Sequence, residues 1–407
     1  MIESCDNYIQ RHRINGRCHN IIVLTSTYLY GIDHILHSIT FNCKNTEHTV
    51  HHYFYNISFV NMSSWNYLDY AEWVHKGCVI NELVTRLNIS YHTDKIKEIY
   101  HLKHLPNLQI LECAGNRIQH IQELELPNLE TLDCSMNEIV DIQGLQLPKL
   151  KTLNCSRNRI VDIQGLQLPN LQDLSCSQNQ IQDIQEITLT SPNLKTLNCS
   201  QNRIQEIQGM QSANLQTLYC YRNQIQDIQE LQGIQLKKLF ASHNQIAEIQ
   251  GLNLPNLQTL ECDGNRIQEI QSIQLPNLHI LNCSDNQIVE IQGLQLPNLL
   301  TLYCSNNQIQ DIQGLALPNL QFLECSRNQI LEIQEIQLPN LQTFKCMDNL
   351  ITKVSFVIPN SLSDLCFLSN PVEYIAPNVE RLMNHSKSRR NVGQVQDQGT
   401  RRIKRRL

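Results

Sequence analysis

Eleven of the 16 cysteines recur at one spacing, and a row of thiols is a potential metal-binding array. Ten of the 11 follow a leucine by two residues, as in Leu-Glu-Cys at 260–262, so the cysteines and leucines are expected to face inward together. Zinc requires four ligands arranged tetrahedrally around one point, which a straight column packed among leucines does not supply. We therefore interpret the column as small buried apolar residues in a reducing compartment. Its members are Cys113, Cys134, Cys155, Cys176, Cys199, Cys220, Cys262, Cys283, Cys304, Cys325 and Cys346.

Potential metal ligands also concentrate near the N-terminus. They are Cys18, His19, Cys43, His48, His51, His52 and Cys78. Their spacing matches no regular zinc finger, so we expect no metal there, and a zinc enzyme in residues 1–100 is the least favoured alternative. The sequence contains no phosphate-binding loop, no nucleophile elbow and no paired carboxylates of an identifiable pocket. We expect no catalytic residues and no cofactor.

The elements that position these residues come from an internal repeat. An asparagine recurs every 21 residues, with one 23-residue step, at positions 116, 137, 158, 179, 202, 223, 244, 265, 286, 307, 328, 349 and 370. The Leu-x-Cys alternation before each asparagine predicts a short strand, and the isoleucines and leucine that follow it, three residues apart, predict a 3₁₀ or extended return. One unit cannot cover its own apolar side, so the 13 units must stack into a solenoid. The repeated asparagine is expected to hydrogen-bond the backbone where the chain leaves the strand.

The repeat resembles the leucine-rich repeat family. The family signature Leu-x-x-Leu-x-Leu-x-x-Asn is matched by Leu257, Leu260, Cys262 and Asn265, with cysteine in place of the third leucine. The resemblance implies an α/β-type solenoid with a parallel β-sheet on its concave face and a 3₁₀ or extended convex side. The nearly identical copies, rich in glutamine and asparagine, are also similar in style to leucine-rich repeat proteins of giant viruses that infect amoebae.

Composition separates the chain into parts, because nine of 13 tyrosines, both tryptophans and 11 of 15 histidines precede residue 105. We predict a small mixed N-terminal domain at 1–78, with a helix that ends at Gly77. A degenerate first repeat and cap at 79–104 should cover the open end of the solenoid at 105–378. A basic disordered tail is predicted at 379–407.

Outward strand positions are where a partner can be recognised, because leucine and cysteine face inward. They lie two, four and six residues before each repeated asparagine, and most are small or polar. Tyr219, Tyr221 and Phe240 depart from this background on adjacent strands, so we predict that they touch. Their basic neighbours are Arg222, Lys237, Lys238 and His243, and Tyr303 and Phe322 are predicted to form a smaller second patch. Aromatic residues clustered with arginine are typical of binding hot spots, although cross-strand aromatic pairs also stabilise sheets.

A column of acids lies four residues after ten of the repeated asparagines. Its members are Asp141, Asp162, Asp183, Glu206, Asp227, Glu248, Glu269, Glu290, Asp311 and Glu332. We interpret it as a solvated face partly neutralised by Arg159, Arg203 and Arg266. Reception of a basic partner, or of the chain's own tail, is the alternative.

The last 21 residues carry eight lysines or arginines and one acid, whereas the whole chain has a net charge of −6. A weak polyanion-binding site or a nuclear-import signal is one interpretation of the basic tail, and a solvated terminus is the alternative; the residues concerned are Arg401, Arg402, Lys404, Arg405 and Arg406. The sequence lacks an apolar run of 18 residues and a secretory signal, so we expect an intracellular protein of the cytoplasm or nucleus that is neither secreted nor in a membrane.

The leading hypothesis is a non-catalytic scaffold that binds a protein partner on its concave face. One alternative is a substrate-receptor adaptor for a ubiquitin ligase, recruited through the N-terminal domain. The other is nucleic-acid binding through the basic tail.

Overall fold

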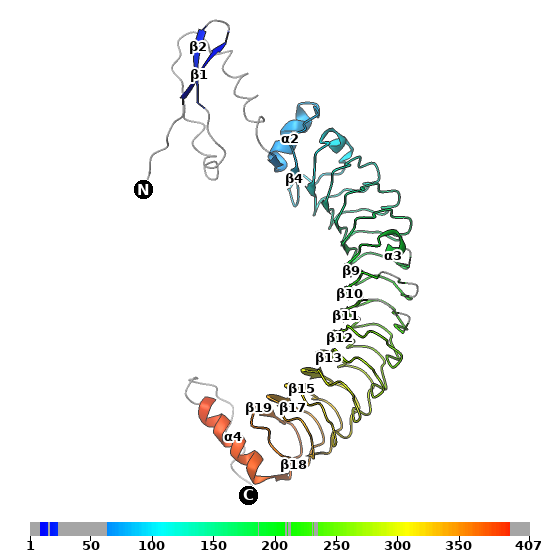
Figure 1. The fold of residues 1–407 in the computed structure, drawn as a ribbon, viewed down its shortest axis with the longest axis vertical. Helices are drawn as coiled ribbons and strands as arrows, with labels where there is room; N and C mark the ends of the chain where they lie inside the picture. Colours follow the sequence, from blue (N-terminus) through cyan, green and yellow to red (C-terminus); the bar gives the residue numbers. More distant parts are fainter. Residues whose placement is uncertain are drawn as a thin grey trace. The chain divides into compact units, whose positions relative to one another are not determined.

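The structure, a computed structural model, describes residues 9–14, 17–22 and 63–390, except for 186, 208–209, 211–212, 230 and 232–234. The chain divides into two compact units, Met1–Asn61 and Met62–Leu407. The described part of the first unit is an antiparallel hairpin of β1 (Ile9–Ile14) and β2 (Arg17–Ile22). The second unit is a solenoid whose strands line its inner side (Figure 1).

In the described part of the second unit, 15 parallel strands form one sheet. The sheet starts with β3 (Ser64–Trp65) and β4 (Arg86–Asn88), and each of the 13 repeat units then adds a three-residue strand. These strands are β5 (Ile110–Glu112), β6 (Thr131–Asp133), β7 (Thr152–Asn154), β8 (Asp173–Ser175), β9 (Thr196–Asn198), β10 (Thr217–Tyr219), β11 (Lys238–Phe240), β12 (Thr259–Glu261), β13 (Ile280–Asn282), β14 (Thr301–Tyr303), β15 (Phe322–Glu324), β17 (Thr343–Lys345) and β19 (Asp364–Cys366). Equivalent residues pair across strands, as Leu239 does with Leu260, so the repeat spacing sets the register. The predicted parallel sheet on the concave face is confirmed.

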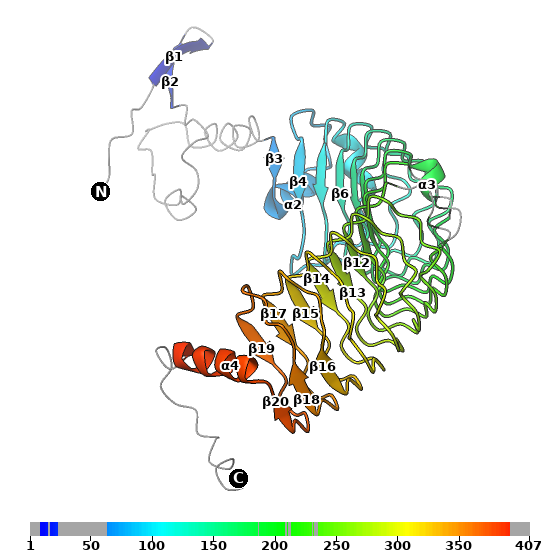
Figure 2. The same ribbon diagram turned by 60° about the horizontal axis from the view of Figure 1, so that its bottom comes forward.

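The return path on the convex side contains little helix. Single turns are closed by 3₁₀-type bonds, such as Leu124 N–H to Ile121 O at 3.2 Å. On the last turns β16 (Glu332–Gln334), β18 (Lys353–Ser355) and β20 (Tyr374–Ile375) form a second parallel sheet, along a different side of the solenoid from β15, β17 and β19 (Figure 2). The 23-residue unit accommodates its extra residues in a four-residue helix, α3 (Ile187–Thr190). The predicted 3₁₀ or extended convex side is therefore confirmed.

Repeated asparagines tie each turn to the one before it. Asn265 donates from Nδ2 to Ala241 O at 3.1 Å, Cys262 O at 2.9 Å and Asp263 O at 3.3 Å. Its Oδ1 accepts from Ile246 N–H at 3.0 Å. The side chain is only 8 % exposed, so one amide satisfies backbone groups of two neighbouring turns inside the molecule.

The N-terminal end of the solenoid begins earlier than predicted. Helix α2 (Tyr67–His75) confirms the expected helix, and Asn66 caps it through a capping box with Asp69. The helix contacts β3 and β4. The ring centroids of its Trp73 and of Trp65 are 5.7 Å apart, and both rings are buried. The compact unit therefore starts at Met62 instead of after residue 78, because these aromatic side chains cover the open end of the first turn. The degenerate first unit continues through β4 and the 3₁₀ helix η3 (Tyr100–His104).

The C-terminal end differs from the predicted disordered tail. Helix α4 spans Pro377–Arg390, so the first part of the range 379–407 is helical. It is anchored to the last turn by Val379, which is fully buried, and by Asn378, whose Nδ2 donates to Phe356 O at 3.0 Å. The five basic residues of the predicted polyanion site lie outside the described residues. No helix within the described ranges is long and apolar enough to cross a membrane.

Candidate binding surface on the concave face

Tyr219 and Phe240 form a stacked pair in the middle of the concave sheet. They are the third residues of β10 and β11 and are direct partners in the parallel register. Their ring centroids are 4.5 Å apart, with an angle of 7° between the ring planes. Both side chains are half-buried, so one ring face shields the other while the remaining surface stays accessible. The predicted contact between these two residues is present.

Tyr221 lies two residues beyond the end of β10 and makes no ring contact with Tyr219 or Phe240 within the described residues. Its carbonyl accepts from Gln201 N–H at 2.8 Å, which makes Ser200 its neighbour in the preceding turn. Ser200 is 0 % exposed, whereas the other buried serines at this repeat position keep 7–9 %. We infer that the tyrosine ring covers Ser200, whose hydroxyl is buried without a hydrogen-bond partner in the described structure. The predicted three-way aromatic contact is thus reduced to a pair beside a separate ring.

The basic residues of the patch do not converge on the aromatic pair. Arg222 and His243 directly precede repeated asparagines and adopt left-handed backbone, with φ of 55° and 54°. His243 lies toward the next turn, with its Nε2 3.8 Å from Asp263 Oδ2. The space that its ring occupies depends on Gly264, because a Cβ there would collide with the imidazole. Lys238, the first residue of β11, is exposed, as Arg222 and Lys237 are.

Two carboxylates on the other side of the pair were not among the predicted site residues. Glu261 is the register partner of Phe240, and its carboxylate has no hydrogen bond or ion pair among the described residues. Burial and the nearby Asp263 raise the pKa of Glu261. Asp263 Oδ1 accepts from Ser242 Oγ at 2.5 Å and from Asn282 Nδ2 at 3.1 Å. The sequence did indicate this acidic site, because Asp263 occupies a repeat position at which most units have serine.

The predicted second patch is present on β14 and β15. The rings of Tyr303 and Phe322 are 5.0 Å apart at 47°. Tyr303 is in register with Glu324, and Glu324 with Lys345. The Lys345 ammonium lies 5.4 Å from the Phe322 ring centroid, so here the chain supplies its own cation to the aromatic surface.

In-register parallel strands joined by an asparagine ladder decide the family, and the sequence comparison agrees with them. Residues 106–317, more than half of the chain, match the family model described as Leucine Rich repeats (2 copies). The chain belongs to the leucine-rich repeat family. The matched stretches are 106–147, 127–168, 148–189, 169–212, 192–233, 234–275 and 276–317.

Solved structures with the same fold come from several sources. An internalin of Listeria monocytogenes is 28 % identical with a TM-score of 0.56, over 68 % of this chain and 81 % of that one. A leucine-rich repeat protein of Leptospira interrogans is 23 % identical with a TM-score of 0.64, over 75 % and 82 %. The functional domain of another Listeria monocytogenes protein, InlJ, is described as including a cysteine ladder; it is 22 % identical with a TM-score of 0.57, over 71 % and 64 %. Comparison with curated proteins gives no match.

In this leucine-rich repeat chain the 11 column cysteines are fully buried between leucines, as predicted. Several thiols donate to a carbonyl of the next strand, as Cys134 Sγ does to Asn154 O at 3.5 Å. Burial raises the pKa of every one of them, and that of Cys220 and Cys283 to about 12, so the thiols stay neutral. The described residues contain no group of three or more His, Cys, Asp or Glu side chains arranged to hold a metal. The N-terminal histidine and cysteine cluster lies mostly outside them.

The acidic column of the leucine-rich repeats is paired differently from the prediction. Gln143 Nε2 donates to Asp162 Oδ2 at 3.1 Å, and Gln164 Nε2 to Asp183 Oδ2 at 3.1 Å. Arg159 instead lies 3.8 Å from Glu138. Neutral amides of the preceding turn therefore hold these carboxylates in place, and the ion pair of Arg159 is made with an acid outside the column.

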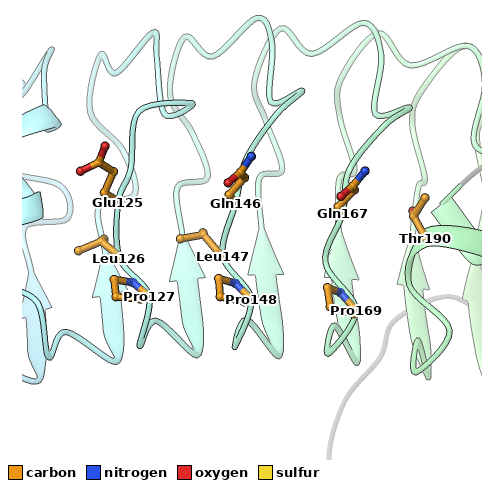
Figure 3. Close-up of a pocket in the computed structure, with 9 residues that line it drawn as sticks. All are labelled: Glu125, Leu126, Pro127, Gln146, Leu147, Pro148, Gln167, Pro169 and Thr190. Carbon is orange, nitrogen blue, oxygen red and sulfur yellow. The ribbon is translucent and has the colours of Figure 1, made fainter.

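A groove of about 830 Å³ runs along the edge of the first leucine-rich repeats, where the chain turns into the strands. It is lined by equivalent residues of successive turns, including Pro127, Pro148 and Pro169, and ends at Thr190 of α3 (Figure 3). Four of its nine lining residues are polar, but they lie on successive turns instead of converging on one point as in a small-molecule site; they are Glu125, Gln146, Gln167 and Thr190.

Proposed function

We propose that this leucine-rich repeat protein is a non-catalytic scaffold that binds a protein partner on its concave face. The observation that carries the proposal is the Tyr219–Phe240 stack, which presents aromatic surface at the centre of a mostly polar sheet. Solenoids of this family use their concave sides as extended binding surfaces. A rigid, half-exposed aromatic pair gains apolar burial on association without losing much side-chain freedom, which is how binding hot spots act.

The adaptor and nucleic-acid alternatives depend on residues 1–61 and 391–407, most of which lie outside the described ranges, and they stay predictions. An intracellular location is also our proposal. The neutral, unpaired thiols of the column support it, because an oxidising compartment would expose them to disulfide exchange during folding.

Replacing the patch with the residues of the preceding unit should weaken partner binding strongly without disturbing the fold. The variant Tyr219→Asn, Tyr221→Ser, Phe240→Asn places at each position a residue that β9 or the turn after it already carries, Asn198 or Ser200. We expect the affinity to fall at least about 30-fold, because loss of a hot spot costs about 2 kcal/mol or more. The measurement is quantitative mass spectrometry of proteins captured from a lysate of producing cells, followed by titration of the partner.

The matched control removes three exposed apolar residues from the return side of the solenoid. Val140→Gln, Val161→Gln and Val289→Gln introduce the residue that most other units have at this position. We expect this control to retain the partner, with urea denaturation showing that both variants remain folded. The proposal would be disproved if the triple variant at Tyr219, Tyr221 and Phe240 still bound the partner and the valine control did not.

A further inference from the structure

The two aromatic patches of the concave sheet share an arrangement but differ in one charge. Along the third strand positions the second patch reads Tyr303, Glu324, Lys345. The first patch reads Phe240, Glu261, Asn282 at the equivalent positions. An aromatic ring and a carboxylate are therefore neighbours in both, and a cation follows only in the second.

The charge around Glu261 remains unbalanced. Asp263 adds a second carboxylate on the same turn, where the second patch has Ser326. His243 lies 3.8 Å from the far oxygen of Asp263 and gives Glu261 no ion pair. Half-burial and the carboxylate of Asp263 disfavour the ionised form of Glu261. A cation beside Glu261 would favour that form again.

We propose that the corner between Phe240 and Glu261 receives an arginine from an extended segment of the protein partner. The inference rests on the proposed function and specifies the chemistry of the partner. A guanidinium can lie flat against a ring while its forked N–H groups donate to a carboxylate, a combination that the compact lysine ammonium does not match. Lys238 lies on the strand of Phe240, and neither it nor Arg222 forms an ion pair with Glu261 in the described structure, so the carboxylate stays available to a cation.

The test is selection of random seven-residue peptides, displayed on phage, against the full-length protein. The expected result is a set of peptides with a shared arginine, whose replacement by citrulline weakens binding of the synthetic peptide at least about 10-fold, as loss of a charged hydrogen-bonded pair does. Glu261→Gln should weaken the same peptides at least about 10-fold, because the shape is kept and the charge removed. The control Glu290→Gln removes an exposed acid from the acidic column and should leave the affinity for the peptide unchanged.

A variant that supplies its own cation gives an independent readout. Asn282→Lys places a lysine next to Glu261 in the strand register, as Lys345 is next to Glu324, so it should compete with the peptide and lower its affinity about 10-fold.

Failure of the inference can be told from failure of the proposed function. Peptides that lack a basic residue, or that tolerate Glu261→Gln, yet are lost with the aromatic triple variant, overturn the inference alone. Peptides that bind the triple variant normally, or a selection without binders, overturn both. Arginine peptides that bind only after deletion of residues 391–407 assign the corner to the chain's own basic tail and overturn the partner assignment.

Discussion

The free energy of unfolding of the solenoid is expected to fall steeply above pH 9. Burial keeps the 11 column thiols neutral in the folded state, raising the pKa of Cys220 and Cys283 to about 12 from an ordinary value of 9.0. Below pH 9 the thiols are protonated in both states, so the full stability is present. Between pH 9 and 12 only the unfolded chain ionises, and each thiol removes about 1.4 kcal/mol per pH unit.

Eleven thiols that ionise in one cooperative unfolding step make this slope about 15 kcal/mol per pH unit. The measurement is urea denaturation followed by circular dichroism, with reductant present, at intervals from pH 7 to pH 10.5. The cysteine column therefore supports the fold only while it is neutral, which follows from its position between leucines.

The chain provides its own control for this prediction. Ala241 occupies the cysteine position of one unit and is fully buried, so alanine fits the column. Cys199→Ala, Cys220→Ala and Cys262→Ala together should reduce the slope above pH 9 by about 4 kcal/mol per pH unit. Parallel pH profiles for the wild type and this variant would assign the alkaline sensitivity to tyrosines or lysines instead.

The solenoid was predictable because one period determines it. Cysteine, leucine and asparagine recur at fixed offsets, so the strand and its inward side follow from one unit, such as residues 254–274, and the register follows from the constant spacing between units. The ends were less predictable because they break the period. Trp65 and Trp73 belong to no repeat, and only the three-dimensional contact with β3 and β4 shows that they close the first turn.

The candidate site was predictable to the same extent. Tyr219 and Phe240 occupy equal offsets on adjacent strands, and the parallel register brings equal offsets together. Tyr221 and His243 lie beyond the strand ends, where the direction of a side chain depends on local backbone and on the space left by a neighbour such as Gly264. The position of Glu261 beside Phe240 followed from the register, but its lack of a partner required the surrounding side chains.

Asn265→Ala is expected to lower the free energy of unfolding by about 3 kcal/mol. The change removes three donated bonds and one accepted bond. The N–H of Ile246 is left buried without a partner, whereas the carbonyls of Ala241 and Cys262 each lose one of two asparagine donors and keep Asn244 and Asn286. Each orphaned buried group costs about 1–3 kcal/mol, partly offset by relaxation and water entry. The measurement is equilibrium denaturation in urea at pH 7.

Asn277→Ala is the matched control in the following unit. This asparagine is exposed and donates one bond, to Pro255 O at 2.8 Å, so its loss should cost under about 1 kcal/mol. Equal destabilisation by both variants would contradict the structural role of the inward ladder.

The effect of breaking the asparagine ladder on peptide affinity should depend on where along the solenoid it is broken. Each turn contacts mainly its neighbours, so Asn265→Ala weakens one interface in the middle of the array and uncouples the two halves. That interface lies between β11 and β12, which carry Phe240 and Glu261. Hydrogen exchange should therefore accelerate on both sides of it, and binding of an arginine peptide should weaken although no contact residue has changed.

Asn370→Ala is the control, because it breaks the ladder at the last turn. There the asparagine donates to Phe367 O and Cys346 O, so its loss should fray that turn and leave peptide binding unchanged.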